Sequence, residues 1–154
     1  MLTNIDIEEI ANQLKLPMVG VFSKDKLPEK RYIGSYYINL QDEADGNGTH
    51  WTFFRIFPSS KAIYFDSFGL PMPIEVKTFL EPFAPVPYSN RHIQDVKSSY
   101  CGWFCLACDF YFEYDAKDKK RGGDIEEQYD DFLNMFSANQ SINDKILKEY
   151  LSMD

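Results

Sequence analysis

The amino-acid sequence predicts an α+β fold, and three patterns indicate it. Short runs of aromatic and β-branched residues between positions 19 and 66 favour strands. Apolar residues recur at helical spacing near the start of the chain, where Ile7, Ile10 and Leu14 make a stripe, and again near its end. Residues 101–114 are apolar on nearly every face, which is typical of a buried central helix. At 154 residues the chain is long enough to bury a core, so we expect a single domain over 1–154.

The first half of the chain is expected to be a helix followed by strands. Thr3 or Asn4 can cap a helix over 3–15, and Pro17 ends it. Turn residues separate the expected extended segments, which are 19–23, 32–40, 50–57 and 62–66. The last two are joined by a short turn and should form an antiparallel hairpin. Such a hairpin brings the start of its first strand beside the end of its second, so His50 should lie within side-chain reach of Asp66.

The second half of the chain alternates connections with helices. The proline-rich stretch 67–90 is expected to be a surface connection with a short helix near 74–80, and 91–96 is expected to be a further strand. After the buried helix come a charged loop and two amphipathic helices, at 115–123, 124–136 and 142–152. Ser141 with Asp144 offers a cap for the second of these helices.

Composition narrows the classes of function. The net charge of -8 disfavours nucleic acid as a partner, because non-specific phosphate binding relies on a basic surface. No apolar stretch is long enough to span a membrane, and the first residues lack the basic and then apolar layout of a signal peptide. The three cysteines crowd into 101–108, which is not a disulfide framework. We therefore expect an intracellular monomer with free thiols, no cofactor and no membrane partner.

Four polar residues together have the chemistry of nucleophilic catalysis: His50, Asp66, Gln94 and Cys101. A thiol nucleophile needs a base, the base needs an orienting carboxylate, and the developing oxyanion needs a donor. Cys101 opens the buried helix, where the dipole and free N–H groups stabilise a thiolate. Gln94 stands shortly upstream, where its amide could donate to an oxyanion. Gly102 would let a substrate backbone approach closely.

The cysteines, the histidines and Trp51 also have simpler or rival explanations. Most cysteines are inert core thiols, which is how we interpret Cys105 and Cys108 inside the helix. A zinc site is a weak alternative, because structural zinc motifs space their cysteines differently, and we expect no metal. His92 is a rival base, although on a strand it would share a face with Gln94 and aim differently. Trp51 is either a shield for the ion pair or a plain core residue.

The motifs around these residues resemble the adenain family of viral cysteine proteases, with the nearer likeness to relatives in virophages, Polinton-like elements and large DNA viruses. The resemblance covers most of residues 4–112. It rests on Gly48-Thr49-His50-Trp51, on Tyr64-Phe65-Asp66-Ser67-Phe68-Gly69, and on Gln94 followed by Ser98-Ser99-Tyr100-Cys101-Gly102-Trp103-Phe104-Cys105. Val21-Phe22-Ser23-Lys24-Asp25-Lys26-Leu27-Pro28 and Tyr37-Ile38-Asn39-Leu40 are also similar to the N-terminal part of that group.

The resemblance implies a papain-like fold and a role for each residue. Cys101 would be the nucleophile, His50 the base, Asp66 its orienter and Gln94 the oxyanion donor, with the Cys101 backbone N–H as a second donor. The implied substrates are viral precursor proteins cut next to glycine, in the virion and the host-cell cytoplasm. Ubiquitin-like protein isopeptidases share this fold and residue order and are the first alternative. A non-catalytic binding module is the second, disfavoured because all four residues are present.

The chain also departs from adenain. Adenain is activated by a peptide disulfide-linked to a cysteine upstream of the nucleophile, and it is stimulated by DNA. Residues 67–100 contain no cysteine here, so an activating peptide would have to bind non-covalently. The one basic cluster, Lys117, Lys119, Lys120 and Arg121, is better interpreted as a solvated loop than as a DNA site.

Overall fold

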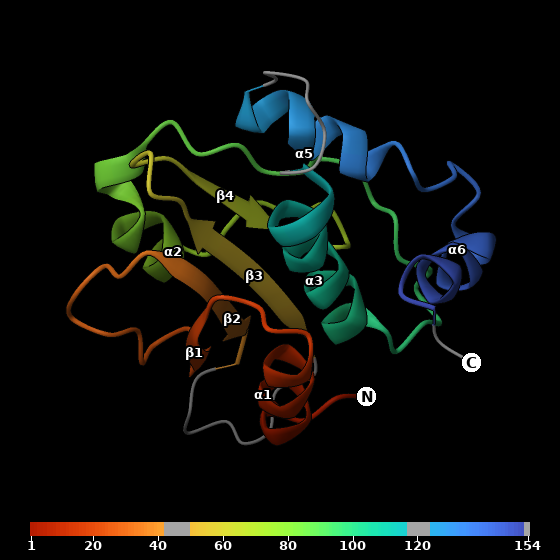
Figure 1. Cartoon of the computed structure of the whole chain (residues 1–154), viewed down its shortest axis with the longest axis horizontal. Helices are drawn as coiled ribbons and strands as arrows, with labels where there is room; N and C mark the ends of the chain where they lie inside the picture. The colour runs from red at the N-terminus through yellow and green to blue at the C-terminus, as the bar shows by residue number, and fades with distance from the viewer. Residues whose placement is uncertain (42–49, 117–123, 153–154) are drawn as a thin grey trace.

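The computed structural model describes residues 1–41, 50–116 and 124–152. Within these ranges the chain folds as a four-stranded sheet with helices on both faces (Figure 1). The strands are β1 (Met18–Ser23), β2 (Gly34–Asn39), β3 (Trp51–Ile56) and β4 (Ala62–Phe65). The helices are α1 (Asn4–Gln13), α2 (Ile74–Phe79), α3 (Cys101–Phe110), α5 (Ile125–Leu133) and α6 (Asn143–Tyr150). The chain also forms short 3-10 turns, η2 (Glu81–Phe83) and η4 (Gln140–Ile142), and a π-helical segment, η3 (Tyr111–Asp115), that continues α3. This architecture confirms the predicted α+β class.

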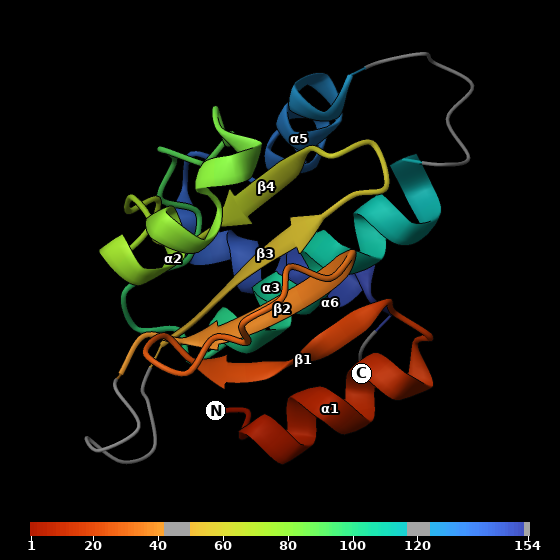
Figure 2. The same cartoon turned by 90° about the vertical axis from the view of Figure 1, so that its left-hand side faces the viewer.

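The strands lie in the order in which they occur in the sequence. β1 runs parallel to β2, whereas β2, β3 and β4 are successively antiparallel. Figure 2 shows this order, with α1 running beside the outer edge of β1. The predicted hairpin is confirmed, with Phe53 opposite Phe65 and Ile56 opposite Ala62. It brings the residue before β3 next to the residue after β4.

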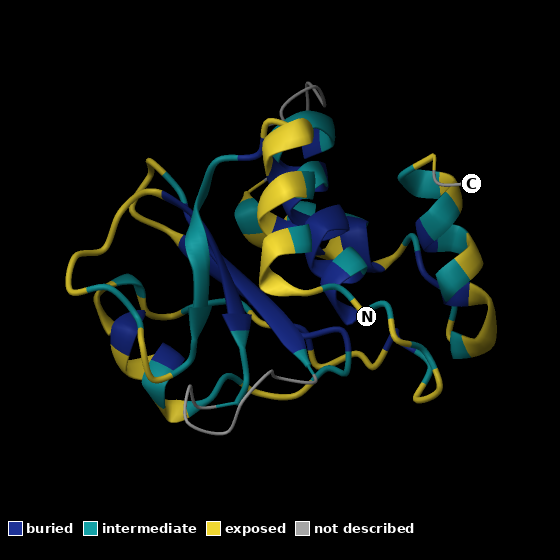
Figure 3. Cartoon of the chain, turned by 90° about the horizontal axis from the view of Figure 1, so that it is seen from below, coloured by how far each residue is buried: buried dark blue, intermediate teal, exposed yellow. Residues whose placement is uncertain are grey.

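The two faces of the sheet carry separate apolar clusters. Side chains alternate along a strand, so Phe53 and Phe65 face α3 whereas Phe54 and Tyr64 face α2. Helices α1, α5 and α6 add side chains to the α3 cluster. Strands β2, β3 and β4 are therefore buried on both sides, as the dark colour of the central strands in Figure 3 shows, whereas β1 is half-buried. The α3 face contains Cys101.

Helix α3 is fixed to the sheet by a buried polar cluster as well as by apolar packing. Asp109 has no exposed surface and accepts hydrogen bonds from the hydroxyl of Ser35 at 2.7 Å and that of Tyr37 at 2.6 Å. The Arg55 guanidinium pairs with it at 3.0 Å and with Glu113 at 2.8 Å. Because a carboxylate is costly to bury without such partners, this cluster favours one placement of the helix on β2 and β3.

Most sequence predictions of the elements are confirmed, with small shifts in their ends. Thr3 caps α1 in a capping box with Asp6, as one of the two caps proposed. The short helix after β4 and the two C-terminal helices are present. Part of the predicted charged loop and the whole basic cluster at 117–121 lie outside the described residues, as does most of the acidic loop before His50. Among the helices that are described, none has both the length and the apolar character to cross a membrane.

Two predictions for the second half are wrong. Residues 91–96 form no strand, because the N–H groups of Ile93 and Gln94 both donate to one carbonyl, that of Ser67. Ser141 does not cap α6 with Asp144. It bonds to Asn139 instead, and Asp144 accepts a hydrogen bond from Ser98.

Candidate active site

His50 and Asp66 meet at the open end of the β3–β4 hairpin. Asp66 directly follows β4, and its Oδ1 lies 2.7 Å from Nε2 of His50. The same oxygen accepts the backbone N–H of Phe68 at 2.8 Å, so the carboxylate is held by its own turn. That turn closes through Gly69, whose φ of +71° favours glycine and whose missing Cβ would lie 2.7 Å from the Arg91 backbone. The turn therefore also brings the segment after Arg91 beside the site.

Cys101 begins α3, as predicted, and its sulfur faces the start of β3. Its Sγ accepts the backbone N–H of Trp51 at 3.4 Å, and the side chain of His50 lies close enough to act on the thiol. Asp66 thus contacts His50, and His50 in turn lies beside Cys101. The cysteine is only 1% exposed.

The electrostatics of these residues favour an ion pair. Burial would raise the pKa of the Cys101 thiol, but its bonds to His50 and to the Trp51 N–H outweigh burial and lower the pKa. Burial would likewise lower the pKa of His50, but its bonds to Asp66 and Cys101 raise it to about 9. Opposite shifts of this kind favour a thiolate beside an imidazolium near neutral pH.

The other two cysteines have the opposite character. Burial raises the pKa of the Cys105 and Cys108 thiols well above the ordinary range, so both stay protonated. Cys105 donates weakly to the Trp51 carbonyl at 3.5 Å. This agrees with their interpretation as core thiols. No cluster of metal-ligating side chains occurs within the described ranges 1–41, 50–116 and 124–152.

His92 lies near His50 but not beside the nucleophile. The ring of Phe68 stacks on His50 with centroids 4.6 Å apart, and His92 meets Phe68 edge-on at 5.1 Å. The idea that His92 shares a strand face with Gln94 is wrong, since no strand forms there. His50 is the histidine that contacts Asp66 and Cys101.

The amide of Gln94 is buried and has a defined orientation. Its Nε2 lies 3.0 Å from the carbonyl of Ser98, and its Oε1 lies 2.5 Å from the hydroxyl of Ser67. A carbonyl can only accept, which assigns Nε2 to the Ser98 side and leaves Oε1 to accept from Ser67. Nε2 keeps a second N–H beyond the one given to Ser98. Ser67 and Ser98 were not predicted from the sequence, because an isolated serine gives no positional signal.

The N-terminal segment lies against the same site, which the sequence did not predict. The Trp51 indole donates to the carbonyl of Leu2 at 2.9 Å. A Cβ added at Gly102 would lie 3.2 Å from Leu2 and 3.4 Å from the Trp51 ring. Figure 1 shows the N-terminus near the start of α3. The space expected beside Gly102 for a substrate backbone is therefore filled by Leu2 and Trp51.

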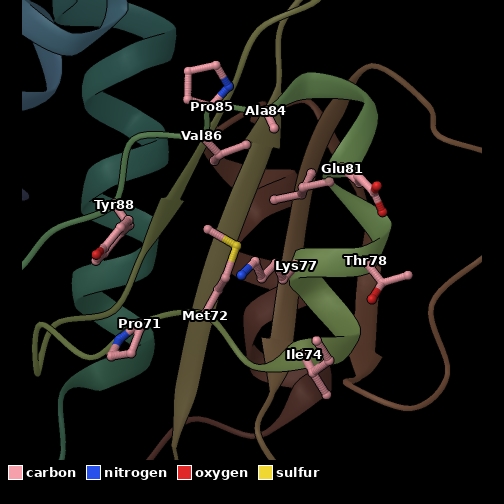
Figure 4. A pocket seen from close by; sticks show the side chains of 11 residues that line it. Pro71, Met72, Ile74, Lys77, Thr78, Glu81, Ala84, Pro85, Val86 and Tyr88 are labelled. Carbon is pink, nitrogen blue, oxygen red and sulfur yellow. The ribbon is translucent and has the colours of Figure 1, made fainter.

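A cavity of about 590 Å³ lies elsewhere, against α2 (Figure 4). Its walls include Met72, Ile74, Val86 and Tyr88. None of the four predicted site residues lines it, so it is separate from Asp66, His50 and Cys101.

Comparison with known proteins finds only a weak structural likeness. No protein-family model matches the chain, and no curated protein matches it. Among solved structures, the crystal structure of the ASFV pS273R protease is similar at 18% sequence identity with a TM-score of 0.47. The match covers 89% of this chain and 68% of that chain. A likeness this weak carries no argument about activity.

Proposed function

We propose that this chain is a cysteine endopeptidase of the adenain type. The observation that carries the proposal is the hydrogen bond between Asp66 and His50 beside the Cys101 thiol, with the thiol pKa lowered and the imidazole pKa raised. A nucleophile, a base and an orienter in this order form the constellation of papain-like proteases. The start of α3 adds the favourable field of a helix N-terminus at the sulfur.

The mechanism follows from these positions. The Cys101 thiolate attacks the carbonyl carbon of the scissile peptide, and the carbonyl oxygen becomes an oxyanion. The remaining N–H of Gln94 and the Cys101 backbone N–H donate to that oxyanion. Protonated His50 gives its proton to the leaving amine, and the C–N bond breaks to leave a thioester. His50 then takes a proton from water, whose hydroxide releases the acid and regenerates the thiolate.

The proposed substrates are viral precursor proteins, such as capsid components, cut next to glycine during virion maturation. This part rests on the likeness of the motifs around His50, Asp66 and Cys101 to the adenain family. The enzyme would act as a monomer in the host-cell cytoplasm and the virion. An activating peptide would bind non-covalently, because residues 67–100 contain no cysteine.

The test is incubation of the purified protein with candidate capsid precursors under reducing conditions, followed by mass spectrometry of the cut ends. The matched control is Cys101→Ala. Cleavage beside glycine by the wild type alone supports the proposal. Release of a ubiquitin-like protein from a lysine conjugate, with no precursor cleavage, would instead support the isopeptidase. Equal cleavage by Cys101→Ala would refute a cysteine mechanism.

A further inference from the structure

We propose that helix α6 positions the oxyanion donor, and that Asp144 acts through Ser98 and Gln94 as a positioning residue for catalysis. The proposal rests on the proposed function for its kinetic consequence. Its structural basis is a set of hydrogen bonds from residues 140–144 to the segment that carries Gln94 and ends at Cys101.

That segment has no regular secondary structure to hold it in place. On one side, the N–H groups of Ile93 and Gln94 donate to the Ser67 carbonyl at 2.9 and 3.1 Å. On the other side, the Gln140 amide donates to the carbonyl of His92 at 2.8 Å. Backbone groups need partners, and here a turn carbonyl and the Gln140 side chain supply what a sheet ladder would have supplied.

Asn143 makes the firmest of these connections. It is fully buried, and its Nδ2 donates to the carbonyls of Ile93 at 2.8 Å and Ser137 at 2.9 Å. Its Oδ1 accepts the Ser137 N–H at 2.7 Å. The amide therefore uses both donors and its oxygen to tie the start of α6 to the backbone next to Gln94.

Asp144 reaches the other end of the segment. The Ser98 hydroxyl donates to Asp144 Oδ1 at 2.8 Å and accepts the Tyr100 N–H at 3.1 Å. The carbonyl of that same Ser98 holds Nε2 of Gln94. Lys148, one turn further along α6, lies over the Tyr100 ring at 5.0 Å. Asp144 thus fixes the peptide that orients the Gln94 amide and precedes the nucleophile.

Asp144 lies in the first turn of α6, but its side chain does not cap that helix. Residue Ile142 occupies the N-cap of α6 with no side-chain bond, and the carboxylate turns to Ser98 instead. Donors to an oxyanion act only within about 2.7–3.1 Å of it. A small displacement of the Ser98 carbonyl would therefore weaken the Gln94 contact in the transition state and leave ground-state binding nearly unchanged.

The experiment is a double-mutant cycle with Asp144→Ala and Gln94→Ala, using kcat and KM on a glycine-containing peptide. We expect Asp144→Ala to lower kcat about tenfold with little change in KM, and to add little once Gln94 is already Ala. Asp144→Asn retains an acceptor for Ser98 and should restore most of kcat. Lys145→Ala, an exposed change on the same helix, is the matched control.

A second measurement does not need a substrate. The side-chain NH₂ resonance of Gln94, assigned by its loss in Gln94→Ala, should shift in Asp144→Ala and stay in place in Asp144→Asn and Lys145→Ala. An unmoved resonance, or fully additive losses of kcat, would overturn the positioning role. A wild-type protein that cleaves nothing would instead refute the proposed function, and the resonance alone would then decide whether α6 positions this amide.

Discussion

Replacing His50 by Ala should return the Cys101 thiol to a pKa at or above the ordinary range for cysteine. In the wild type, burial raises the thiol pKa and the bonds to His50 and to the Trp51 N–H lower it by more. The variant keeps the burial and the Trp51 N–H but loses the cationic partner. The raising effect of burial on the thiol pKa is then opposed only by backbone N–H groups, which are too weak to cancel it.

The size of the effect follows from the ion pair. The His50 pKa of about 9, against 6.5 for a free imidazole, corresponds to roughly 3 kcal/mol of preference for the charged ring. Asp66 and Cys101 both contribute to that preference, so His50→Ala removes from the thiolate its part of it. A free-energy difference of about 1.4 kcal/mol changes an equilibrium constant about tenfold. A loss of about that size should lower the thiolate fraction at pH 6.5 about tenfold in His50→Ala.

The assay is alkylation of Cys101 by iodoacetamide, quantified on its peptide by mass spectrometry. The ratio of the rates at pH 6.5 and pH 9 within one variant removes differences in access to the sulfur. His92→Ala is the control and should keep the wild-type ratio, and Cys105 and Cys108 should remain unlabelled while the protein is folded. Equal ratios for His50→Ala and wild type would refute the ion pair.

The same pair predicts a bell-shaped pH profile for kcat/KM. Activity should fall on the acid side as the thiolate takes up its proton at the lowered Cys101 pKa. It should fall on the alkaline side as His50 loses its proton near its pKa of about 9. A profile that keeps rising beyond pH 10 would contradict a protonated His50.

Four further changes have separable outcomes. Asp66→Asn should lose less kcat than His50→Ala, because the orienter does not itself react. Gln94→Ala should lower kcat about 10²- to 10³-fold with a smaller change in KM. Leu2→Gly should raise the alkylation rate of the nucleophile equally at both pH values. Asp109→Ala should lower the free energy of unfolding in urea by about 3 kcal/mol, because it removes the buried partner of a buried guanidinium.

For three of these changes, a specific different result would contradict the expectation. An Asp66→Asn loss equal to that of His50→Ala would make the carboxylate essential to the chemistry. A change in KM alone would make Gln94 a substrate-binding residue. An unchanged urea midpoint in Asp109→Ala would show that the buried cluster under α3 adds nothing to stability.

The meeting of His50 and Asp66 could be predicted because local geometry determines it. A short turn between two strands brings the ends of the hairpin together whatever packs against it, so His50 finds Asp66. The apolar character of 101–114 marks a buried helix, and its first residue points its sulfur at the start of β3. These relations depend on periodicity and order, both of which are visible in a single sequence.

The surroundings of Gln94 could not be predicted for the opposite reason. Val96 and Ile93 make 91–96 look extended, but the segment is held by side chains from residues 140–144 and by one carbonyl from a turn. Contacts between such distant positions leave no periodic pattern. Ser98 and Asp144 carry no local sign of the bond between them, so the sequence favours pairing Asp144 with Ser141, which the structure does not show.

The prediction for Leu2 follows from the closed state of the site. A substrate carbonyl must come within about 3–3.5 Å of the sulfur, yet Cys101 is 1% exposed and Leu2 lies against Gly102. Moving Leu2 away breaks one hydrogen bond to the Trp51 indole, worth about 1 kcal/mol. It also exposes part of a leucine side chain, worth up to about 2 kcal/mol. The open form would then hold about 1–10% of the population, and Leu2→Gly, which removes the side chain, should raise the Cys101 alkylation rate about tenfold. If the rate is unchanged, Leu2 does not limit access, and the movement that exposes the sulfur must involve Trp51 or the segment before Cys101.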